Sequence, residues 1–253
     1  MTRLSVALCI RNESANLQEC LATAKFADEI VVLLDRSTDD SVAIARAAGA
    51  KVIEGAWEIE GDRRNTAIEA CAGPWVLELD ADERITPALA SEIRDAIQRA
   101  ETDAYVIPFE NHIGGRAIKY GWGAYNGTSA KAALFRKGIK IWGRERVHPT
   151  IVFSGSRGRL NAPMLHYVYA DIAAIVAKLN RYSDLAAEDL ADKGDAGPRG
   201  HAIRRVFSRF YKAYVARKGY KEGAIGVALG LMAGLFPLLS HLKAQEKLAA
   251  RQR

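Results

Sequence analysis

The most informative segment of this 253-residue chain is Trp75-Val76-Leu77-Glu78-Leu79-Asp80-Ala81-Asp82-Glu83-Arg84. Its apolar, strand-forming residues end in three acids within four positions, which predicts a buried strand that delivers carboxylates to its C-terminal end. In an open α/β sheet, ligands bind at this end of the strands. Asp80 and Asp82 are hard oxygen donors suited to Mg²⁺ or Mn²⁺, which would keep coordination positions for phosphate oxygens. The alternative is an acidic turn that begins the next helix.

The segments before this strand alternate between strand and helix patterns. We expect strands at 4–10, 30–34 and 50–54, and helices of about ten residues from Asn16, from the 35–40 turn to about 48, and over 62–71. Strands separated by such helices form a parallel sheet with right-handed crossovers, so residues 1–100 are predicted to be a nucleotide-binding half. The chain has no GxGxxG after the first strand and no GxxxxGK[ST] loop, which disfavours a dinucleotide or P-loop site.

The segments after this half are less regular. A helix is expected over 87–99 and strands at 104–108, 132–136, 150–153 and 163–169, followed by an amphipathic helix over 171–191. The region 111–127 is rich in Gly and contains Tyr120, Trp122 and Tyr125. Aromatic residues in an irregular segment are useful for stacking on a sugar or base, so we expect a functional loop here.

The composition is that of a folded globular protein with an excess of positive charge. The chain is 49% hydrophobic and 26% charged, with a net charge of +6. Cys9, Cys20 and Cys71 form no CxxC pair, so neither a disulfide framework nor a zinc site is expected, and a reducing cytoplasm is the simplest location. Residues 1–3 lead into a short apolar run, so we expect no signal peptide.

The C-terminal part has a different character. Residues 199–221 contain eight Lys or Arg and no acid, interleaved with aromatic residues, and we expect a basic amphipathic helix over 203–218. Ala224 to Ser240 is a 17-residue run without a charge, slightly short for a membrane-spanning helix. We interpret this run as an interfacial helical hairpin on an anionic membrane; the alternative is a buried helix. A nucleic-acid surface does not need such a run, so no nucleic-acid partner is expected.

Several motifs together resemble glycosyltransferase family 2, which has the GT-A fold. They are Arg11-Asn12-Glu13 after the first strand, Asp35 with Ser37-Thr38-Asp39, Arg64-Asn65, and residues 79–84. The later motifs 134–136, 142–143, 146–148, 165–167 and 179–182 resemble the branch that includes lipopolysaccharide-core β-glucosyltransferases. The resemblance implies an α/β fold, with a GT-A type Rossmann-like mixed sheet flanked by helices and a C-terminal helical membrane-associated extension.

The resemblance also implies a function and a domain organisation. We expect an inverting enzyme that moves a hexose from a UDP-sugar, such as UDP-glucose, to a lipid-linked saccharide acceptor at the inner face of the cell membrane. The pathway would be lipopolysaccharide core or other cell-envelope polysaccharide synthesis. The transferase domain would span 1–195, with an acceptor half at 101–195, and the extension 196–253. A non-catalytic nucleotide- or glycan-binding relative is the alternative.

The family's binding residues carry over onto matching positions of this chain. Asp35 falls where the family binds the nucleoside, although Arg36 replaces the family's usual small residue, and Asp39 is as plausibly a helix cap. Arg11 would stack on uracil, Asp80 would lie near the ribose, and Asp82 would hold the Mg²⁺ or Mn²⁺ ion. The remaining expected nucleotide-sugar residues are Asn12, Glu13, Arg64 and Ala81; a surface pairing of Arg64 with Asp62 is the alternative. His148 and His166 are candidate metal or phosphate ligands.

The catalytic base is the position where the resemblance is incomplete. Relatives commonly have one acid before the strand that contains 134–136 and a second acid directly after the histidine that corresponds to His148. This chain has Ser129 at the first of these positions and Pro149 at the second. An inverting transfer needs a carboxylate to accept the proton of the acceptor hydroxyl. Glu145 is the nearest acid and is our predicted base, and Glu110 and Asp171 are the reserves.

Overall fold

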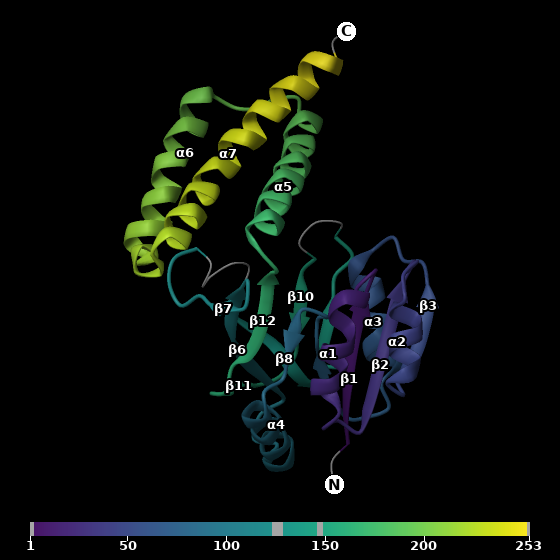
Figure 1. Cartoon of the computed structure of the whole chain (residues 1–253). Coiled ribbons are helices and arrows are strands. Elements are labelled where there is room, and N and C mark those ends of the chain that lie inside the picture. The colour runs from purple at the N-terminus through teal and green to yellow at the C-terminus, as the bar shows by residue number, and fades with distance from the viewer. Residues whose placement is uncertain (1–2, 123–128, 146–148, 252–253) are drawn as a thin grey trace. The chain divides into compact units, whose positions relative to one another are not determined.

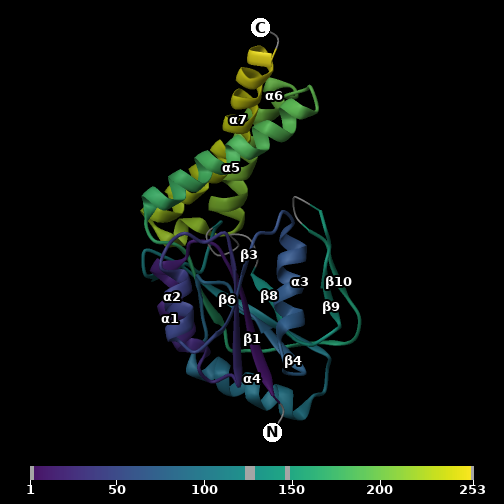
Figure 2. The same cartoon turned by 90° about the vertical axis from the view of Figure 1, so that its right-hand side faces the viewer.

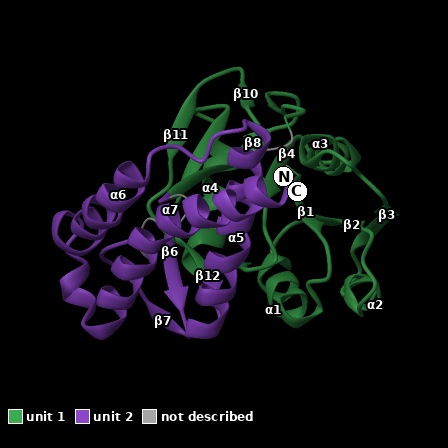
Figure 3. Cartoon of the chain, turned by 90° about the horizontal axis from the view of Figure 1, so that it is seen from above, with its two compact units in different colours: residues 1–109, 130–166 green, residues 110–129, 167–253 purple. Residues whose placement is uncertain are grey.

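The structure is a computed structural model, and it describes residues 3–122, 129–145 and 149–251. Compactness divides the chain into unit 1, residues 1–109 and 130–166, and unit 2, residues 110–129 and 167–253 (Figure 3). The boundary expected after residue 195 separates the transferase domain from the C-terminal extension by function rather than by compactness, and it stays a prediction.

Unit 1 begins with alternating strands and helices. These are β1 (Leu4–Ile10), α1 (Ser14–Ala24), β2 (Glu29–Asp35), α2 (Ser41–Ala47), β3 (Lys51–Gly55), α3 (Glu60–Ala70), β4 (Trp75–Glu78), β5 (Glu83–Arg84) and α4 (Pro87–Arg99). The elements that follow are strands: β6 (Ala104–Ile113), β7 (Arg116–Ala117), β8 (Ala130–Arg136), β9 (Lys140–Trp142), β10 (Ile151–Phe153), β11 (Arg157–Arg159) and β12 (Met164–Tyr169). Of these, β7 and the last residues of β6 and β12 belong to unit 2.

The main sheet is mixed, as expected for the GT-A fold. Its strand order is β3-β2-β1-β4-β8-β6-β12-β5, with β7 and β11 also paired to β6. The pairs β2–β3, β1–β2 and β1–β4 are parallel, which confirms the predicted parallel half. The pairs β4–β8 and β6–β8 are antiparallel. Because β1 and β4 are parallel neighbours, their carboxyl-terminal ends lie next to each other on the same side of the sheet.

Alternation along β1 separates two apolar layers. Leu4, Val6, Leu8 and Ile10 pack in one cluster with residues of α1, α2 and α4, whereas Ala7 packs in the other with Ala67 and Ile68 of α3. Successive side chains of a strand point to opposite faces, so one strand contributes to both layers. Accordingly, α1 and α2 cover one face of the parallel strands and α3 covers the other (Figures 1 and 2).

Unit 2 is mainly helical. It contains α5 (Ile172–Asp192), α6 (Arg199–Tyr211), a π-helical turn η2 (Lys212–Ala216), a 3₁₀ turn η3 (Gly219–Glu222) and α7 (Ala224–Arg251). The apolar run 224–240 does not turn back on itself, so the hairpin expected within it is wrong. The run is the first part of one continuous helix that passes through Pro237.

The glycines of this run serve close packing rather than turns. A Cβ added at Gly226 would lie 1.9 Å from the Gly219 carbonyl oxygen, and one at Gly234 would lie 2.7 Å from the Val206 carbonyl oxygen. These glycines therefore let α7 approach η3 and α6 at backbone distance. By length and composition alone, α7 is long and apolar enough to cross a membrane, but 44% of its most apolar 18-residue stretch is buried within the protein.

Three cations of α7 pair with acids of α5. Lys243 Nζ lies 2.9 Å from Asp184 Oδ1, and Lys247 Nζ lies 2.7 Å from Glu188 Oε2. Arg251 Nη2 lies 2.8 Å from Asp192 Oδ1. On both helices the charged residues are spaced four apart, about one turn of an α-helix, so the pairs form a ladder.

Candidate active site

A cleft of about 330 Å³ opens at the carboxyl ends of β1 and β4 in unit 1. It is lined by Cys9, Ile10, Arg11, Glu13, Arg63, Asp80, Ala81, Asp82 and His166. The structure thus brings together six of the predicted site residues: Arg11, Glu13, Asp80, Ala81, Asp82 and His166. Asn12, Asp35, Arg64 and Glu145 do not line it, and His148 lies outside the described residues.

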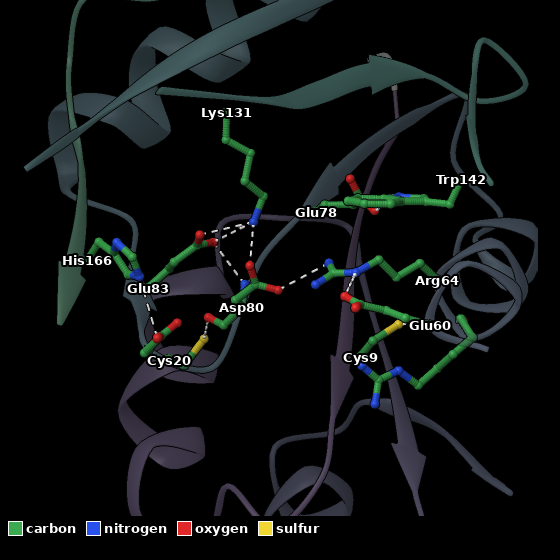
Figure 4. A network of polar contacts seen from close by, with 12 residues as sticks. Cys9, Cys20, Glu60, Arg64, Glu78, Asp80, Glu83, Lys131, Trp142 and His166 are labelled. Carbon is green, nitrogen blue, oxygen red and sulfur yellow. Dashed lines mark hydrogen bonds and ion pairs between the residues drawn. The ribbon is translucent and has the colours of Figure 1, made fainter. Parts of the chain in front are cut away.

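Asp80 is held by two cations. Its Oδ1 lies 3.3 Å from Arg64 Nη1, and its Oδ2 lies 2.9 Å from Lys131 Nζ (Figure 4). Burial alone would raise the pKa of Asp80, but Lys131 and Arg64 outweigh it and hold this pKa well below its usual range. Asp80 is therefore ionised and internally neutralised.

Lys131 is a site residue that the sequence reasoning missed. Its ammonium group also lies 3.0 Å from each carboxylate oxygen of Glu83, and the Asp80 N–H donates to Glu83 Oε2 at 2.8 Å. Burial raises the pKa of Glu83 to about 7, against the opposing effect of Lys131. The available signal was slight: a lone Lys among the small residues of the strand Ala130–Arg136.

Arg64 lies between the carboxylate of Asp80 and the ring of Trp142. Its Nε donates to Glu60 Oε1 at 2.9 Å, and its guanidinium carbon lies 4.7 Å from the centre of the Trp142 ring. The alternative of a surface Arg paired with Asp62 is therefore wrong. Asn65 fixes Trp142 by donating to its carbonyl oxygen at 2.9 Å and accepting from its N–H at 3.0 Å.

A further buried acid, Glu78, contacts the ring of Trp142. Glu78 is 3% exposed, pairs with Lys140, and accepts a hydrogen bond of 2.7 Å from Trp142 Nε1. Burial, opposed by Glu78, lowers the pKa of Lys140. The pair anchors β9 to β4, because removing either partner would leave a buried charge uncompensated.

Asp82 differs from Asp80 in having no ammonium or guanidinium partner within the described residues. Its Oδ2 lies 3.5 Å from His166 Nε2, which β12 brings beside β5. No group of three metal-ligating side chains comes together in the described part of unit 1 or unit 2. A Mg²⁺ or Mn²⁺ ion is commonly held by one or two protein ligands plus phosphate oxygens, and the Asp82–His166 pair fits such a substrate-completed site.

Asp35 is buried and already saturated. Its Oδ1 accepts from Arg36 Nε at 2.9 Å and from the Trp57 N–H at 3.1 Å. Its Oδ2 accepts from Arg36 Nη2 at 3.1 Å and from Arg63 Nη1 at 3.4 Å. Burial acts to raise the pKa of Asp35, but these hydrogen bonds lower it. Because a carboxylate has about four acceptor positions, a nucleoside can bind Asp35 only if one partner leaves.

The loops after β1 and β2 are joined by hydrogen bonds. The Asn12 N–H donates to Ser37 Oγ at 3.2 Å, and Asn12 Oδ1 accepts from the Thr38 N–H at 2.8 Å. Asp39 accepts from the Ser14 N–H at 2.9 Å and the Ser41 N–H at 3.1 Å. Asp39 therefore caps the starts of α1 and α2, which supports the alternative interpretation of this residue.

The candidate bases have local partners. Glu145 Oε2 accepts from the Thr150 N–H at 3.0 Å and Oε1 from Thr150 Oγ1 at 2.8 Å. Hydrogen bonds from its own N–H and from Thr150 lower the pKa of Glu145. In unit 2, Glu110 lies 2.8 Å from His112 Nε2, and Asp171 caps α5 through the Ala174 N–H.

The described part of the Gly- and aromatic-rich region 111–127 is held from within unit 2. Glu222, which is 5% exposed, accepts from the Lys119 and Tyr120 N–H groups at 2.8 and 2.9 Å. It also accepts from Arg116 Nη2 at 2.9 Å. The buried carboxylate of Glu222 thus fixes the backbone of this segment. This role was not predictable from the sequence, because Glu222 is more than 100 residues away from the segment.

Comparison with known proteins agrees with this architecture. A family model described as glycosyl transferase family 2 matches residues 5–143. An uncharacterised glycosyltransferase of Rickettsia felis is 27% identical, covering 98% of this chain and 91% of its own. The lipopolysaccharide core biosynthesis glycosyltransferase LpsC of Rhizobium meliloti is 23% identical, covering 99% and 94%. The crystal structure of S. aureus TarS 1–349 covers 99% of this chain and 92% of its own, with a TM-score of 0.50 and 16% identity.

The mixed sheet, with acids at the carboxyl ends of its parallel strands, defines a GT-A type fold, as predicted. Since the family model matches more than half of its residues, the chain belongs to glycosyltransferase family 2. The predicted class of enzyme, a glycosyltransferase, is thereby confirmed.

Proposed function

We propose that the chain is an inverting, metal-dependent transferase that moves a hexose from a UDP-sugar, such as UDP-glucose, to a lipid-linked saccharide acceptor. The reaction would belong to lipopolysaccharide core or other cell-envelope polysaccharide synthesis. The observation that carries this proposal is the cleft where Asp82 and His166 lie together with Arg11 and Arg63. The similarity to LpsC, a lipopolysaccharide core biosynthesis glycosyltransferase, supports the choice of pathway.

Each residue of the cleft would have a role that follows from its chemistry. Asp82 and His166 would hold a Mg²⁺ or Mn²⁺ ion, which would act as a Lewis acid on the diphosphate. Arg63 and Arg11 add positive charge to the same cleft, and the planar guanidinium of Arg11 suits stacking on uracil. Asp80, which Lys131 and Arg64 orient, would accept a hydrogen bond from a ribose hydroxyl. Glu145 stays the predicted base.

The test is UDP release from a panel of UDP-sugars with Mn²⁺, for the wild-type chain and for Asp82→Ala. We expect release by the wild type and a loss of at least 100-fold in Asp82→Ala, because the diphosphate would lose the ion that stabilises it. Asp95→Ala is the control, since Asp95 is exposed on α4 and does not line the cleft. Equal rates for both variants would contradict the proposal.

A non-catalytic nucleotide- or glycan-binding relative is the second candidate, favoured by Ser129 and Pro149, which occupy the positions where relatives commonly have acids. Thermal shift with the same panel separates the two, because a ligand that binds the native state raises the melting temperature whether or not it reacts. Stabilisation by a UDP-sugar without UDP release, for any of the acceptors tried, would favour the binding protein. Stabilisation accompanied by release supports the transferase.

We further propose that α6 holds the protein on the inner face of an anionic membrane. Its exposed apolar residues Ile203, Phe207 and Tyr211 are spaced four apart, and Phe207 and Tyr211 are 69% and 61% exposed. Residues at this spacing share one face of a helix. The surrounding Arg and Lys residues suit anionic lipid, each adding about 1 kcal/mol near the surface.

Vesicle sedimentation tests this second proposal. Phe207→Ser with Tyr211→Ser should weaken binding to vesicles containing phosphatidylglycerol about tenfold or more, because two aromatic anchors are lost. Leu185→Ser is the matched control, since Leu185 is 59% exposed on α5, away from the basic helix. Wild-type binding that does not depend on phosphatidylglycerol, or equal losses in the variants, would contradict the role of α6.

A further inference from the structure

Unit 2 contains a cavity of about 370 Å³ between α5, the α5–α6 connection, α6 and α7. Its wall is amphipathic. Leu190, Phe236 and Pro237 form an apolar part, and Lys193, His201 and Arg205 bring nitrogen donors to the same space. Asp189 is the carboxylate among the described lining residues. None of the described residues that line the transferase cleft also lines this cavity.

His241 gives this cavity wall an unsatisfied polar atom. The residue is 3% exposed, and its Nδ1 lies 2.9 Å from the Ala196 carbonyl oxygen. A carbonyl can only accept, so Nδ1 carries the hydrogen and Nε2 of the neutral ring carries the lone pair. Nε2 is buried and has no partner within the described residues. Such an atom is costly to leave unpaired, and a hydroxyl donor would satisfy it once a small shift of the ring opens Nε2 to the cavity.

The cations of the wall are also unpaired, in contrast to their neighbours. Lys243, Lys247 and Arg251 on α7 each pair with an acid of α5. Within the described residues, Lys193 and Arg205 form no ion pair. His201 Nδ1 lies 3.4 Å from Arg204 Nη2, and because a guanidinium can only donate, Nε2 of His201 carries a hydrogen. The wall therefore offers two free cations and one N–H donor against the single carboxylate of Asp189.

We propose that this cavity binds a phosphate ester that carries a hydroxyl and an apolar chain, the chemistry of an anionic glycerophospholipid. Lys193, Arg205 and His201 supply charge and donors for the phosphate. His241 Nε2 accepts from the hydroxyl, and Leu190, Phe236 and Pro237 receive the start of the apolar chain. A free phosphate ester shares the head-group chemistry, so the apolar contribution must be measured separately.

The experiment follows the imidazole signals of the full-length protein by NMR, without donor sugar. The probes are dihexanoyl phosphatidylglycerol below its micelle concentration, glycerol 1-phosphate and inorganic phosphate, with dihexanoyl phosphatidylcholine as the zwitterionic control. We expect saturable shifts of the His201 and His241 signals with phosphatidylglycerol, at least tenfold tighter than with either phosphate, and no saturation with phosphatidylcholine. Because the wild-type protein is titrated, this result does not depend on any variant folding.

The matched variants are Arg205→Gln, which removes a lining cation, and Lys212→Gln, which removes the same charge outside this cavity. Arg205→Gln should weaken phosphatidylglycerol binding about tenfold or more, as expected for one charge-assisted hydrogen bond, and Lys212→Gln should stay within twofold. Equal losses in both variants, or no saturable shift in the wild type, would overturn the site. Equal affinity for inorganic phosphate would overturn the apolar part of the ligand. None of these outcomes affects the transferase test, which reads UDP release.

Discussion

The Lys131 ammonium lies 2.9 Å from Asp80 Oδ2 and 3.0 Å from both carboxylate oxygens of Glu83, so one cation pairs with two acids, the half-buried Asp80 and the buried Glu83. Lys131→Met should lower the free energy of unfolding by about 3–5 kcal/mol, because Glu83 would be left buried without its counter-charge. Urea denaturation measures the change.

The double variant Lys131→Met with Glu83→Gln is the control for this prediction. Removing both partners should restore part of the lost stability, since no uncompensated charge remains at Glu83. A double variant whose loss equals the sum of the two single losses would show that the pair is not coupled.

Arg36 is predicted to compete with the nucleoside for Asp35. Arg36 has a left-handed backbone with φ of 50°, a conformation that glycine adopts without steric cost. Arg36→Gly should free two acceptor positions and tighten UDP binding about five- to tenfold, as calorimetry would show.

Arg36→Ala separates the side chain from the backbone in this prediction. It should tighten UDP binding as much as Arg36→Gly, whereas the glycine variant should exceed the alanine variant in free energy of unfolding by about 1 kcal/mol, because glycine adopts the left-handed backbone without strain. Unchanged UDP affinity in both variants would count against Asp35 as a nucleoside ligand.

Glu145 as the general base predicts a kinetic signature. Glu145→Gln should lower kcat about 10²–10⁴-fold with little change in UDP-sugar affinity, because the carboxylate acts only on the acceptor hydroxyl. Steady-state kinetics with a competent acceptor checks this. A kcat within threefold of the wild type would exclude Glu145 and direct attention to Glu110→Gln and Asp171→Asn.

Asp28 predicts a dependence of stability on pH. The hydrogen bonds from Arg94 and the Leu4 N–H lower the pKa of Asp28 in the folded protein. Its contribution is therefore present above the unfolded pKa of about 3.9 and is lost as pH falls through the folded value. Asp28→Asn should cost about 1 kcal/mol at pH 7, and the difference from wild type should vanish in acid. Denaturation across pH 2–7 measures it, with Asp95→Asn as a control that should show no such trend.

The parallel half of the sheet was predictable because β1, β2 and β4 are mainly apolar runs bounded by polar turns, and the short β3 follows a helix that ends at a glycine. The strands β5, β7, β9 and β11 were not predicted, since they have only two or three residues and depend on partners distant in sequence. The hairpin in the 224–240 run was wrong for a related reason. Gly226 and Gly234 look like turn residues in sequence but are contact points for η3 and α6.

Arg11, Glu13, Asp80 and Asp82 of the cleft were predictable because they follow strand ends, where side chains converge. Arg63, on α3, was not predicted: the sequence indicated its neighbour Arg64, which does not line the cleft. The charge states of the acids were not predictable either. Asp80 is neutralised by Lys131 from β8, and Asp35 is saturated in part by the Trp57 N–H, which lies 22 residues further along the chain. Such pairings depend on the register between β4 and β8 and on the path of the 55–60 segment, which no local pattern encodes.

The ladder between α5 and α7 has a mechanical consequence. If α7 were displaced along α5 by about 6 Å, roughly one turn, Lys243 would reach Glu188 and Lys247 would reach Asp192, so two of the three cations would find an acid again. A shorter displacement would separate Lys243 and Lys247 from their acids before the next acids come within reach. The ladder therefore favours the present register of the two helices and opposes small displacements of α7 along α5.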